Sequence, residues 1–587
     1  MKQPYSQFSR RYFLSTGAKS AAGLGALGLL PAGARPVLLA SAAPQGAGGR
    51  ASALQPAFAR LDEFVTRHMG ETGAPGLTLA LANREGPLRV STYGLADIKT
   101  GARVQPETLF QIGSISKSFV AVLLLQLRDE GKLDLHKPVT QYLPWLKINS
   151  RFEPITTHHL LSHTAGLPGA PLLLDALLAE LPTGTKPGTH FLYSNTGYNI
   201  LGFLVEALDA RPFAAAMRAR VLEPLGMRAS APVISNETRG RMAVGYQPFD
   251  EDRPFPFLGR LAEAPWIEMD MAAGSVAATP ADMASYVRAL LNRGALPRGG
   301  RLFSEESFRL MTTPAIKAPF RGEDASYGYG LWISDINGHT RLRHTGGMVA
   351  FSSALDVDVS GGVGAFASVN ANLAGYRPVA VARFAVDALT ASSEGKPLPP
   401  LPSPTPTPEE IKNAADFAGA FTSPDGRKIA FAAEGSRLLL LHDGRRVTLE
   451  RSRAGADQFV TRHPDFALYR LAFGREKGRV VEVSYGADWY AGAAYAGART
   501  FDRPKEWDAY VGHYFNDSPW YGSTRVLIRK GQLLLDGAQT LLQTADGSFM
   551  LANDESAPDR IRFESIVGGR AMRLNYSGIV FRRVFTP

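Results

Sequence analysis

The sequence of 587 residues contains no cysteine. This absence excludes disulfide bonds, metal sites built on thiolates, a cysteine nucleophile and a lipid-modified N-terminal cysteine. The chain is also poor in membrane-spanning signals, since the apolar stretch near its N-terminus, 21–30, is short and rich in glycine. Thiol chemistry is therefore excluded, and a stable N-terminal membrane anchor is disfavoured.

A strong charge of one sign is missing as well. The formal net charge of +10 falls to +5 when residues 1–42, which carry basic but no acidic side chains, are set aside. Because no basic stripe is interleaved with aromatic residues, we expect no nucleic-acid partner. Hydrophobic residues make up 45% of the chain and charged residues 20%, which is typical of folded globular domains, and the length predicts several of them.

The first 42 residues have the features of an export signal. Ser9-Arg10-Arg11-Tyr12-Phe13-Leu14 resembles the twin-arginine motif, and the apolar stretch 21–30 follows it. Ala40-Ser41-Ala42 supplies small residues for a signal peptidase, so we expect cleavage after Ala42. The mature protein would then be periplasmic or secreted and have no stable membrane anchor. An uncleaved anchor is the alternative.

Composition divides the remaining chain into a mixed part and a β-rich part. After a linker at 43–55, residues 56–395 alternate helical and strand-like patterns, for example a strand over Gly76–Ala82 and a helix over Asp282–Leu291. Proline then dominates the segment 396–409, which predicts an extended, semi-rigid linker and a domain boundary.

Beyond this linker we predict two small β-rich modules, 410–503 and 504–587, that resemble each other. Asp443-Gly444 and Asp536-Gly537, for instance, follow similar leucine-rich segments and are 93 residues apart. Coincidence between strand-rich stretches is the alternative, and three matches in the same order argue against it. The matched segments are 417–421 with 510–514, 438–444 with 532–537, and 481–486 with 572–578.

The segment Phe110–Leu127 is apolar except near its start. Apolar residues on nearly every side predict a helix in a domain interior, and Gly131 is typical of its C-terminal cap. Ser114 and Lys117 are three residues apart, so they share one face of the first turn. Burial disfavours a charged lysine, and a neutral amine beside a serine hydroxyl can activate it as a nucleophile. Alternatively, Ser114 is only an N-cap and Lys117 points into solvent.

Two further motifs accompany Ser114 and Lys117. Tyr193-Ser194-Asn195 precedes another helical pattern, and His344-Thr345-Gly346-Gly347 enters a predicted strand. With these motifs in this order, residues 56–395 resemble the penicillin-recognising serine hydrolases: class C β-lactamases, D-alanyl-D-alanine carboxypeptidases, D-aminopeptidases and β-lactamase-like esterases. The other similar stretches are 160–168, 222–227, 272–284 and 327–332.

The resemblance implies an α+β fold of the β-lactamase/transpeptidase-like type. An antiparallel sheet flanked by helices would meet an all-helical lobe, with the site at their junction. The two β-rich, barrel-like modules resemble the β-barrel domains appended to some D-aminopeptidases and related peptidases. We expect a loop from one of them to cover the site and to limit the size of the substrate.

The resemblance also implies the chemical roles of the motif residues. Ser114 would be the nucleophile that forms an acyl-enzyme. Lys117 and Tyr193 would share the proton transfers, and either of them could be the base. A tyrosine has a pKa of about 10, so it needs a nearby cation such as Lys117 to ionise at neutral pH.

The same resemblance implies how the substrate would be held. Asn195 would hydrogen-bond the substrate amide and Lys117, and the backbone N–H groups of Ser114 and Gly347 would form an oxyanion hole. Glycine at 346 and 347 suits a strand edge that a substrate backbone approaches closely. The substrate-binding residues implied in this way are Asn195, His344, Thr345 and Gly346.

His344 departs from the β-lactamases, which typically carry lysine at this position. An unperturbed histidine has a pKa of about 6.5 and is mostly neutral at pH 7. We therefore expect weaker selection for an anionic substrate tail and inefficient penicillin hydrolysis, as in the peptidase and esterase branches. The alternative is a hydrogen-bonded strand histidine without substrate contact.

No metal ligands are predicted. His158, His159 and His163 stand close together, but no H-E-x-x-H motif or suitably spaced carboxylate accompanies them, so we interpret them as structural. Tyr514-Phe515-Asn516 and His442-Asp443-Gly444 imitate two of the catalytic motifs beyond the linker, and we interpret these as structural too.

The sequence thus predicts an exported serine hydrolase that acts through an acyl-enzyme on an ester or an amide, including peptides of D-amino acids. A carboxylesterase or a weak β-lactamase is an alternative. Another is a non-catalytic cell-wall binding or scaffold protein, although the intact set of motif residues argues against it. The expected partner is a small-molecule, peptide or ester substrate without a cofactor, and the sequence carries no signal for a particular oligomeric state.

Overall fold

The computed structural model describes residues 48–169, 181–250, 252–318, 324–373, 375–552 and 556–585. The predicted export signal at 1–42 lies outside these residues. Within them, no helix combines the length and the apolar character that a membrane crossing requires.

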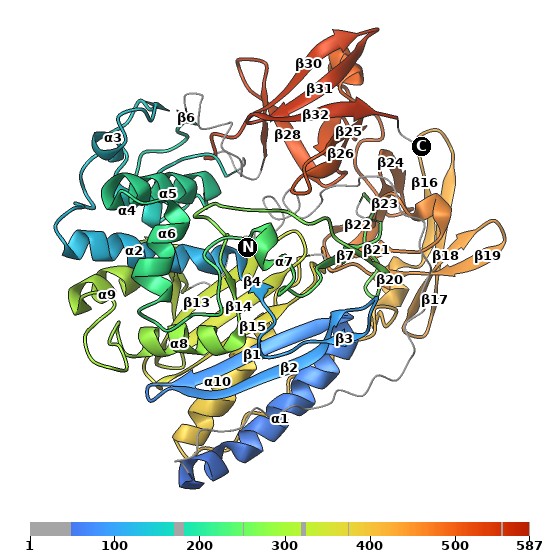
Figure 1. Cartoon of the computed structure of the whole chain (residues 1–587). Coiled ribbons are helices and arrows are strands. Elements are labelled where there is room, and N and C mark those ends of the chain that lie inside the picture. The colour runs from blue at the N-terminus through green and yellow to red at the C-terminus, as the bar shows by residue number, and fades with distance from the viewer. Residues whose placement is uncertain are drawn as a thin grey trace.

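Nine antiparallel strands form the central sheet of the first part of the chain (Figure 1). The N-terminal strands β1 and β2 complete this sheet by pairing beside a meander from much later in the sequence. In spatial order the strands are β10 (Ile316–Lys317), β11 (Ser326–Tyr327), β12 (Trp332–Ile336), β13 (His339–Gly347), β14 (Ser352–Asp358), β15 (Val363–Val369), β1 (Gly76–Asn83), β2 (Pro87–Asp97) and β3 (Ala102–Arg103).

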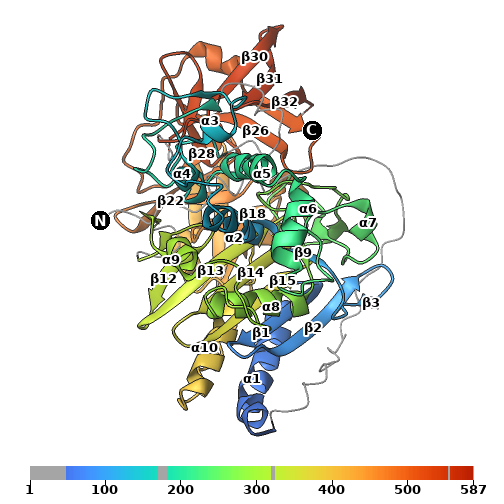
Figure 2. The same ribbon diagram turned by 60° about the vertical axis from the view of Figure 1, so that its left-hand side comes forward.

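Helices cover both faces of this sheet (Figure 2). The covering helices are α1 (Gly48–Thr72) and α10 (Val379–Ser393) on one face and α8 (Pro280–Leu291) on the other. Leu77 and Leu79 of β1 pack with α1 and α10, while Ala80 belongs to the core on the other side. Because both faces of β1 are buried, its residues are apolar at successive positions rather than at alternate ones. Each fully buried leucine stabilises the fold by about 2 kcal/mol.

The segments that flank this domain differ from each other. The predicted linker at 43–55 is helical from Gly48 onward, because its alanines favour a helix and Leu54 packs against the core. The proline-rich segment 396–409 contains no helix or strand and lies along α1, where the N–H of Thr405 donates to Glu71 at 3.1 Å. The domain limits themselves remain predictions.

A helical lobe packs beside the sheet around α2, whose apolar residues are buried on every side as predicted. The backbone N–H of Lys132 donates to the carbonyl of Leu127, and Gly131 has φ +71°, which confirms the glycine cap. The elements of the lobe and its surroundings are η1 (Gly113–Ile115), α2 (Ser116–Asp129), α3 (Val139–Tyr142), α4 (Thr157–Leu161), α5 (Asn195–Asp209), α6 (Phe213–Met217), the π-helical turn η3 (Arg218–Leu222), α7 (Asn236–Arg239) and α9 (Glu305–Thr312).

Three two-stranded pairings tie the long connections together. One of them joins the strand just before Ser114 to the segment just after Gly274, so it fixes the approach to the predicted nucleophile. The pairs are β4 (Phe110–Gln111) with β9 (Ala277–Ala278), β5 (Ile148–Asn149) with β6 (Leu181–Pro182), and β7 (Tyr246–Pro248) with β8 (Leu261–Glu263).

The last part of the chain forms two β-meanders, which confirms the predicted pair of β-rich modules. The first is a nine-stranded sheet in the order β19-β18-β17-β16-β24-β23-β22-β21-β20. Its elements are η4 (Ala414–Phe417), β16 (Gly419–Thr422), β17 (Lys428–Glu434), β18 (Arg437–His442), β19 (Arg445–Thr448), β20 (Glu450–Arg451), β21 (Gln458–Val460), η5 (Pro464–Phe466), β22 (Leu471–Glu476), β23 (Arg479–Tyr485) and β24 (Asp488–Ala491).

The second meander is a closed eight-stranded barrel, which lies above the helical lobe and the central sheet in Figure 1. Its elements are η6 (Lys505–Ala509), β25 (Gly512–Asn516), β26 (Gly522–Arg529), β27 (Gln532–Leu535), β28 (Gln539–Gln543), β29 (Phe549–Leu551), β30 (Ile561–Val567), β31 (Arg570–Tyr576) and β32 (Ile579–Val584).

The two meanders repeat the same local structure, in agreement with the repeat seen in the sequence. Asp443 and Gly444 connect β18 to β19, and Asp536 and Gly537 connect β27 to β28. All four residues have positive φ, which is the conformation of a tight hairpin turn and explains the Asp-Gly pairs. In both meanders the first strand pairs with the last. The strand after the Asp-Gly turn is continuous in the second (β28) and is interrupted at Leu449 in the first (β19 and β20).

Candidate active site

The predicted nucleophile lies where the helical lobe meets the central sheet. Ser114 is partly exposed within η1, which continues directly into α2, so it is at the helix end where N–H groups and the positive end of the dipole point outward. Gly113 has φ +54°, and a Cβ at this position would lie 2.8 Å from the backbone N of Gly347. The turn that carries Ser114 is therefore in direct backbone contact with the end of β13.

Lys117 is completely buried beside Ser114, which confirms the predicted burial. Its Nζ lies 3.0 Å from Oγ of Ser114, 2.8 Å from Oδ1 of Asn195 and 2.7 Å from the carbonyl oxygen of Ala273. Burial lowers the pKa of the Lys117 side chain well below its usual range. No carboxylate is among these three contacts to offset that effect.

The neighbours of Nζ fit an unprotonated amine. Asn195 Oδ1 and the Ala273 carbonyl can only accept, so they take the two N–H bonds of a neutral amine. The remaining lone pair then faces the hydroxyl of Ser114, which can donate its proton to it. This geometry supports proton transfer from Ser114 to Lys117.

Tyr193 packs beside the amine of Lys117. Nζ of Lys117 lies 5.0 Å from the centroid of the Tyr193 ring, and the centroid of the His163 ring lies 4.1 Å from that of Tyr193. Nδ1 of His163 also accepts a hydrogen bond from the backbone N–H of Ser194 at 3.0 Å. His163 thus holds the Tyr193-Ser194 backbone and ring in place, although its own φ of +57° is unusual for a residue other than glycine.

Asn195 is the first residue of α5, and Ser194 caps this helix through a hydrogen bond from the N–H of Gly197. One turn later, Oδ1 of Asn199 accepts from the backbone N–H of Ala273 at 3.1 Å. Two side chains of one helix face therefore fix both Lys117 and the peptide that binds it. Sequence analysis did not single out Asn199, although its i, i+4 spacing from Asn195 was the available signal.

The H-T-G motif lies at the end of β13 rather than at its start. His344 is buried, and its Nε2 lies 3.1 Å from the Tyr327 hydroxyl while Nδ1 lies 2.8 Å from the carbonyl oxygen of Thr345. Since a carbonyl only accepts, Nδ1 carries a proton. Both ring nitrogens therefore have partners inside the protein, as in the hydrogen-bonded strand histidine considered as an alternative above.

The two glycines of this motif have close neighbours within the protein itself. A Cβ on Gly346 would lie 1.9 Å from the carbonyl oxygen of Ile112 and 2.2 Å from Oγ of Ser353. A Cβ on Gly347 would collide with the guanidinium of Arg377. Internal packing thus already requires glycine at 346, where backbone blocks a Cβ, whereas at 347 the Arg377 side chain would have to move. Both positions keep the role in substrate approach proposed from the sequence.

His158, His159 and His163, which stand close together in the sequence, have hydrogen-bond partners within the protein. Nδ1 of His158 lies 2.7 Å from the Tyr329 hydroxyl. His159 takes part in the capping box of α4, and burial lowers the pKa of its ring to about 4. With His163 bonded to Ser194, all three stabilise the local fold around the site.

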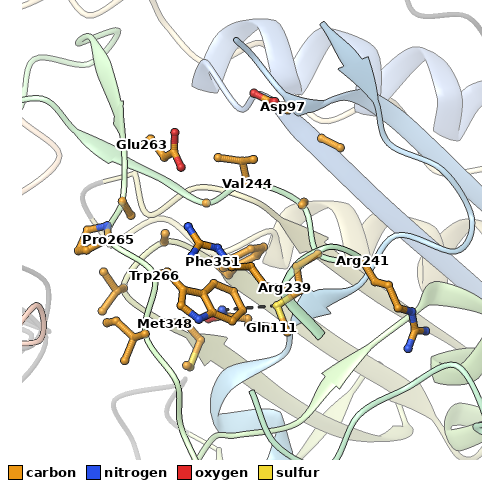
Figure 3. A pocket seen from close by; sticks show the side chains of 18 of the residues that line it. Asp97, Gln111, Arg239, Arg241, Val244, Glu263, Pro265, Trp266, Met348 and Phe351 are labelled. Atoms are coloured by element: carbon orange, nitrogen blue, oxygen red, sulfur yellow. Dashed lines mark hydrogen bonds between the residues drawn. The ribbon is translucent and has the colours of Figure 1, made fainter. Parts of the chain in front are cut away.

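A cavity of about 760 Å³ lies beside the segments that precede Ser114 and follow Gly347, although none of the motif residues Ser114, Lys117, Tyr193, Asn195 and His344 lines it (Figure 3). Its walls include Gln111, three residues before Ser114, and Met348, which directly follows Gly347. The cavity is apolar where Trp266, Met348 and Phe351 line it, and the guanidinium of Arg239 lies 5.4 Å from the Trp266 ring. Arginines 103 and 241 line it as well.

The C-terminal barrel forms part of these walls. Trp520 lines the cavity and belongs to the same apolar cluster as Met348 and Phe351. Asp559 accepts a hydrogen bond from the N–H of Gly169 at 3.0 Å, next to Pro168, whose carbonyl accepts from Ser194 Oγ. The barrel thus contacts the cavity through Trp520 and, through Asp559, the segment that binds Ser194.

A buried lysine next to a serine at a helix start, flanked by Tyr-x-Asn and a strand-end His-Thr-Gly, is the arrangement of a penicillin-recognising serine hydrolase. Residues 61–385, more than half of the chain, match the family described as Beta-lactamase, and the chain belongs to that family.

Individual relatives agree with this assignment. The chain is 29% identical to penicillin-binding protein 4 of Amycolatopsis lactamdurans over 54% of its own length and 84% of the relative's. It is 33% identical to the esterase EstB of Burkholderia gladioli, over 34% of its own length and 56% of the relative's. The matches span between about half and five sixths of the length of the first curated relatives.

A solved structure supports the fold of a larger share of the chain. The octameric penicillin-binding protein homologue from Pyrococcus abyssi superposes with a TM-score of 0.53 and 24% identity. It covers 74% of this chain and 99% of its own. The likeness extends beyond the 61–385 segment and supports the fold alone.

Proposed function

We propose that the protein is a serine hydrolase that acts through an acyl-enzyme on an amide, such as a peptide containing D-amino acids, or on an ester. The observation that carries this proposal is the buried Lys117, whose Nζ lies 3.0 Å from Oγ of Ser114 while both remaining N–H directions are occupied. A residue whose pKa is lowered by burial and aimed at a hydroxyl is suited to general-base catalysis.

In the proposed reaction, Lys117 takes the hydroxyl proton as Oγ of Ser114 attacks the substrate carbonyl carbon. The negative charge that develops on the carbonyl oxygen is stabilised by the N–H groups of Ser114 and Gly347. When the bond to the leaving group breaks, Tyr193 delivers a proton to the departing nitrogen or oxygen and recovers one from Lys117. Water then attacks the carbonyl carbon of the acyl-enzyme and gives a proton to the neutral Lys117. Lys117 passes this proton to Oγ of Ser114 as the bond to the acyl group breaks, which releases the acid and restores the serine.

The geometry favours Lys117 over Tyr193 as the first base. An ionised tyrosine at neutral pH needs a persistent cation beside it, but burial lowers the pKa of Lys117 and favours the neutral amine. The second proton transfer is then assigned to Tyr193, and the 5.0 Å between Nζ and the centroid of its ring supports this role.

The substrate is proposed to place a bulky, partly apolar group in the cavity next to Gln111 and Met348. Burial and internal bonding of His344 support the expectation that this residue does not select an anionic tail. The names of the relatives, a penicillin-binding protein and an esterase, support both the amide and the ester branch of the proposal.

Export through the twin-arginine route is also proposed, from the motif around Arg10 and Arg11. The protein should reach the periplasm or the medium. Replacing both arginines by lysine should retain it in the cytoplasm, as cell fractionation and immunodetection would reveal. Equal export of the double variant would contradict this route.

The decisive experiment is intact-mass spectrometry of the protein mixed with p-nitrophenyl acetate, with Ser114→Ala as the control. An acetyl adduct or turnover that is lost in the variant supports the proposal. Equal labelling of both proteins would show that Ser114 is not the nucleophile. No adduct and no turnover, also with D-amino-acid anilides and a cephalosporin, would favour the non-catalytic alternative.

A further inference from the structure

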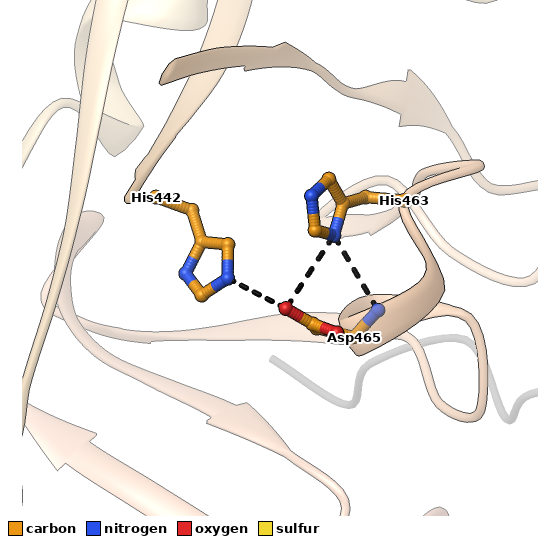
Figure 4. Close-up of side chains that lie close together, drawn as sticks. All are labelled: His442, His463 and Asp465. Atoms are coloured by element: carbon orange, nitrogen blue, oxygen red, sulfur yellow. Dashed lines mark hydrogen bonds and ion pairs between the residues drawn. The ribbon is translucent and has the colours of Figure 1, made fainter. Parts of the chain in front are cut away.

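Two histidines and a carboxylate meet on the surface of the first meander, far along the chain from the catalytic motifs (Figure 4). Nε2 of His442 lies 2.8 Å from Oδ2 of Asp465, and Nδ1 of His463 lies 3.9 Å from the same oxygen. Their ligand atoms all lie within 4.8 Å of one another. No other group of three such residues in the described part of the chain meets this condition.

The spacing fits the coordination shell of a small transition-metal ion. With metal–ligand bonds of about 2.0–2.2 Å, two ligand atoms of a tetrahedral zinc ion lie about 3.4 Å apart. The two separations, 2.8 and 3.9 Å, lie on either side of that value. Nδ1 of His463 now accepts a hydrogen bond from the N–H of Asp465 at 3.4 Å, and it must give up this bond to bind the ion because it has a single lone pair. The carboxylate of Asp443, 3.5 Å from Nε2 of His442, is available as a fourth ligand.

The local structure holds these side chains in position. The rings of His442 and His463 lie 5.1 Å apart, and Phe466 packs edge-on against His442 at 5.0 Å. Pro464 begins η5 between the two ligands His463 and Asp465, which restricts the backbone there. All three ligand side chains remain solvent-accessible, from 21% for His463 to 58% for Asp465, so an ion can reach them.

The position of the group within the sheet gives the ion a structural role. β18, which ends at His442, pairs with β19, and β21, which precedes His463, pairs with β20. β19 and β20 follow each other in the chain, separated only by Leu449, and together they correspond to β28 of the barrel, which pairs with β27 and β29. The ligands therefore come from the two sides of this strand, and an ion would link them across it.

We propose that His442, His463 and Asp465 bind one divalent transition-metal ion, such as Zn²⁺, which links β18 to the segment that follows β21 in the first meander. Imidazole nitrogen and carboxylate oxygen are ligands that suit zinc and its neighbours in the first transition series. The ion stabilises the closed curl of this sheet and takes no part in acyl transfer.

The test uses the full chain, purified without a histidine tag and treated with a chelator. Titration with Zn²⁺ is followed by calorimetry, and Co²⁺ binding by its visible absorption. We expect one equivalent per chain and a higher melting temperature of the first meander with Zn²⁺. His442→Asn and Asp465→Asn should each weaken binding at least tenfold and abolish the melting shift.

His463→Asn should weaken binding as the other two variants do, and it should disturb the local fold least, because asparagine can still accept the hydrogen bond from the N–H of residue 465 that His463 accepts now. His190→Asn removes an exposed histidine elsewhere and should leave both readouts unchanged. Binding that is absent, or that is equal in the wild type and the His442→Asn variant, would overturn the proposal. Labelling of Ser114 is measured on the same samples and should not depend on Zn²⁺, so the two proposals succeed or fail separately.

Discussion

A carboxylate placed beside Lys117 would test the proposed base directly. Asn195→Asp substitutes a negative charge for the neutral oxygen that lies 2.8 Å from Nζ. With an effective dielectric constant of about 20, Coulomb attraction at that distance amounts to about 6 kcal/mol, an upper bound because the new carboxylate is desolvated as well. Opposite charges at such short range raise the pKa of a lysine by about 1 to 3 units in practice.

The sign of the effect on activity follows from the protonation state that the reaction needs. Burial lowers the pKa of Lys117, so the wild type should keep its activity at neutral pH and lose it as the pH falls through that lowered pKa. In Asn195→Asp the ammonium is stabilised. The acidic limb of the kcat/KM profile should therefore move to higher pH by about 1 to 3 units.

The assay is the pH dependence of kcat/KM for p-nitrophenyl acetate, since this parameter reports the free enzyme. Asn195→Ala is the matched control: it removes the same contact with Lys117 without adding charge, so its acidic limb should not move upward. An unshifted limb in a folded, active Asn195→Asp enzyme would refute Lys117 as the base. If activity at neutral pH is lost, acetylation of Ser114 should return in alkaline buffer, and its absence there would equally refute the assignment.

Two further predictions concern the walls of the site. Gly346→Ala would place a Cβ 1.9 Å from the carbonyl oxygen of Ile112, so β13 and the turn that carries Ser114 must separate. We expect the rate of acylation to fall at least a hundredfold and the melting temperature to fall as well. Gly338→Ala is the control for backbone strain alone, because Gly338 is exposed, has open space around it and lies just before β13. Trp520→Ala should enlarge the cavity and raise kcat/KM for bulky acyl esters relative to acetate, because this side chain closes one wall from the barrel; an unchanged ratio between the two substrates would show that the cavity does not hold the acyl group.

Patterns confined to one helix or strand were well predicted from the sequence. The burial of Lys117 follows from the apolar residues around it in α2, and the structure places it with no exposed surface. The glycine cap at Gly131 and the Asp-Gly turns at 443–444 and 536–537 are equally local, since each depends on backbone conformations that few residues adopt. Such features need no knowledge of the tertiary fold.

Contacts supplied by the backbone of distant segments could not be predicted in the same way. The carbonyl of Ala273 binds Nζ of Lys117 at 2.7 Å, but every residue has a carbonyl, so no side-chain pattern marks this one. The reason for Gly346 is similar, because its close neighbours, Ile112 and Ser353, come from two other elements. His442 and Asp465 gave no metal signal for the same reason: only the curl of the sheet brings β18 and η5 together.

The two meanders show how one repeated pattern can serve two purposes. Both contain the same Asp-Gly turn and pair their first strand with their last, so the sequence repeat determines a common topology. The strand after the Asp-Gly turn also pairs on both sides in each repeat, with β18 and β21 in the first and with β27 and β29 in the second. In the second meander the barrel supplies Trp520 to the wall of the cavity and Asp559 to the backbone of Gly169. In the first, the segments on the two sides of the β19–β20 strand bring His442, His463 and Asp465 together. The same topology thus supports the hydrolase domain in one repeat and offers a set of metal ligands in the other.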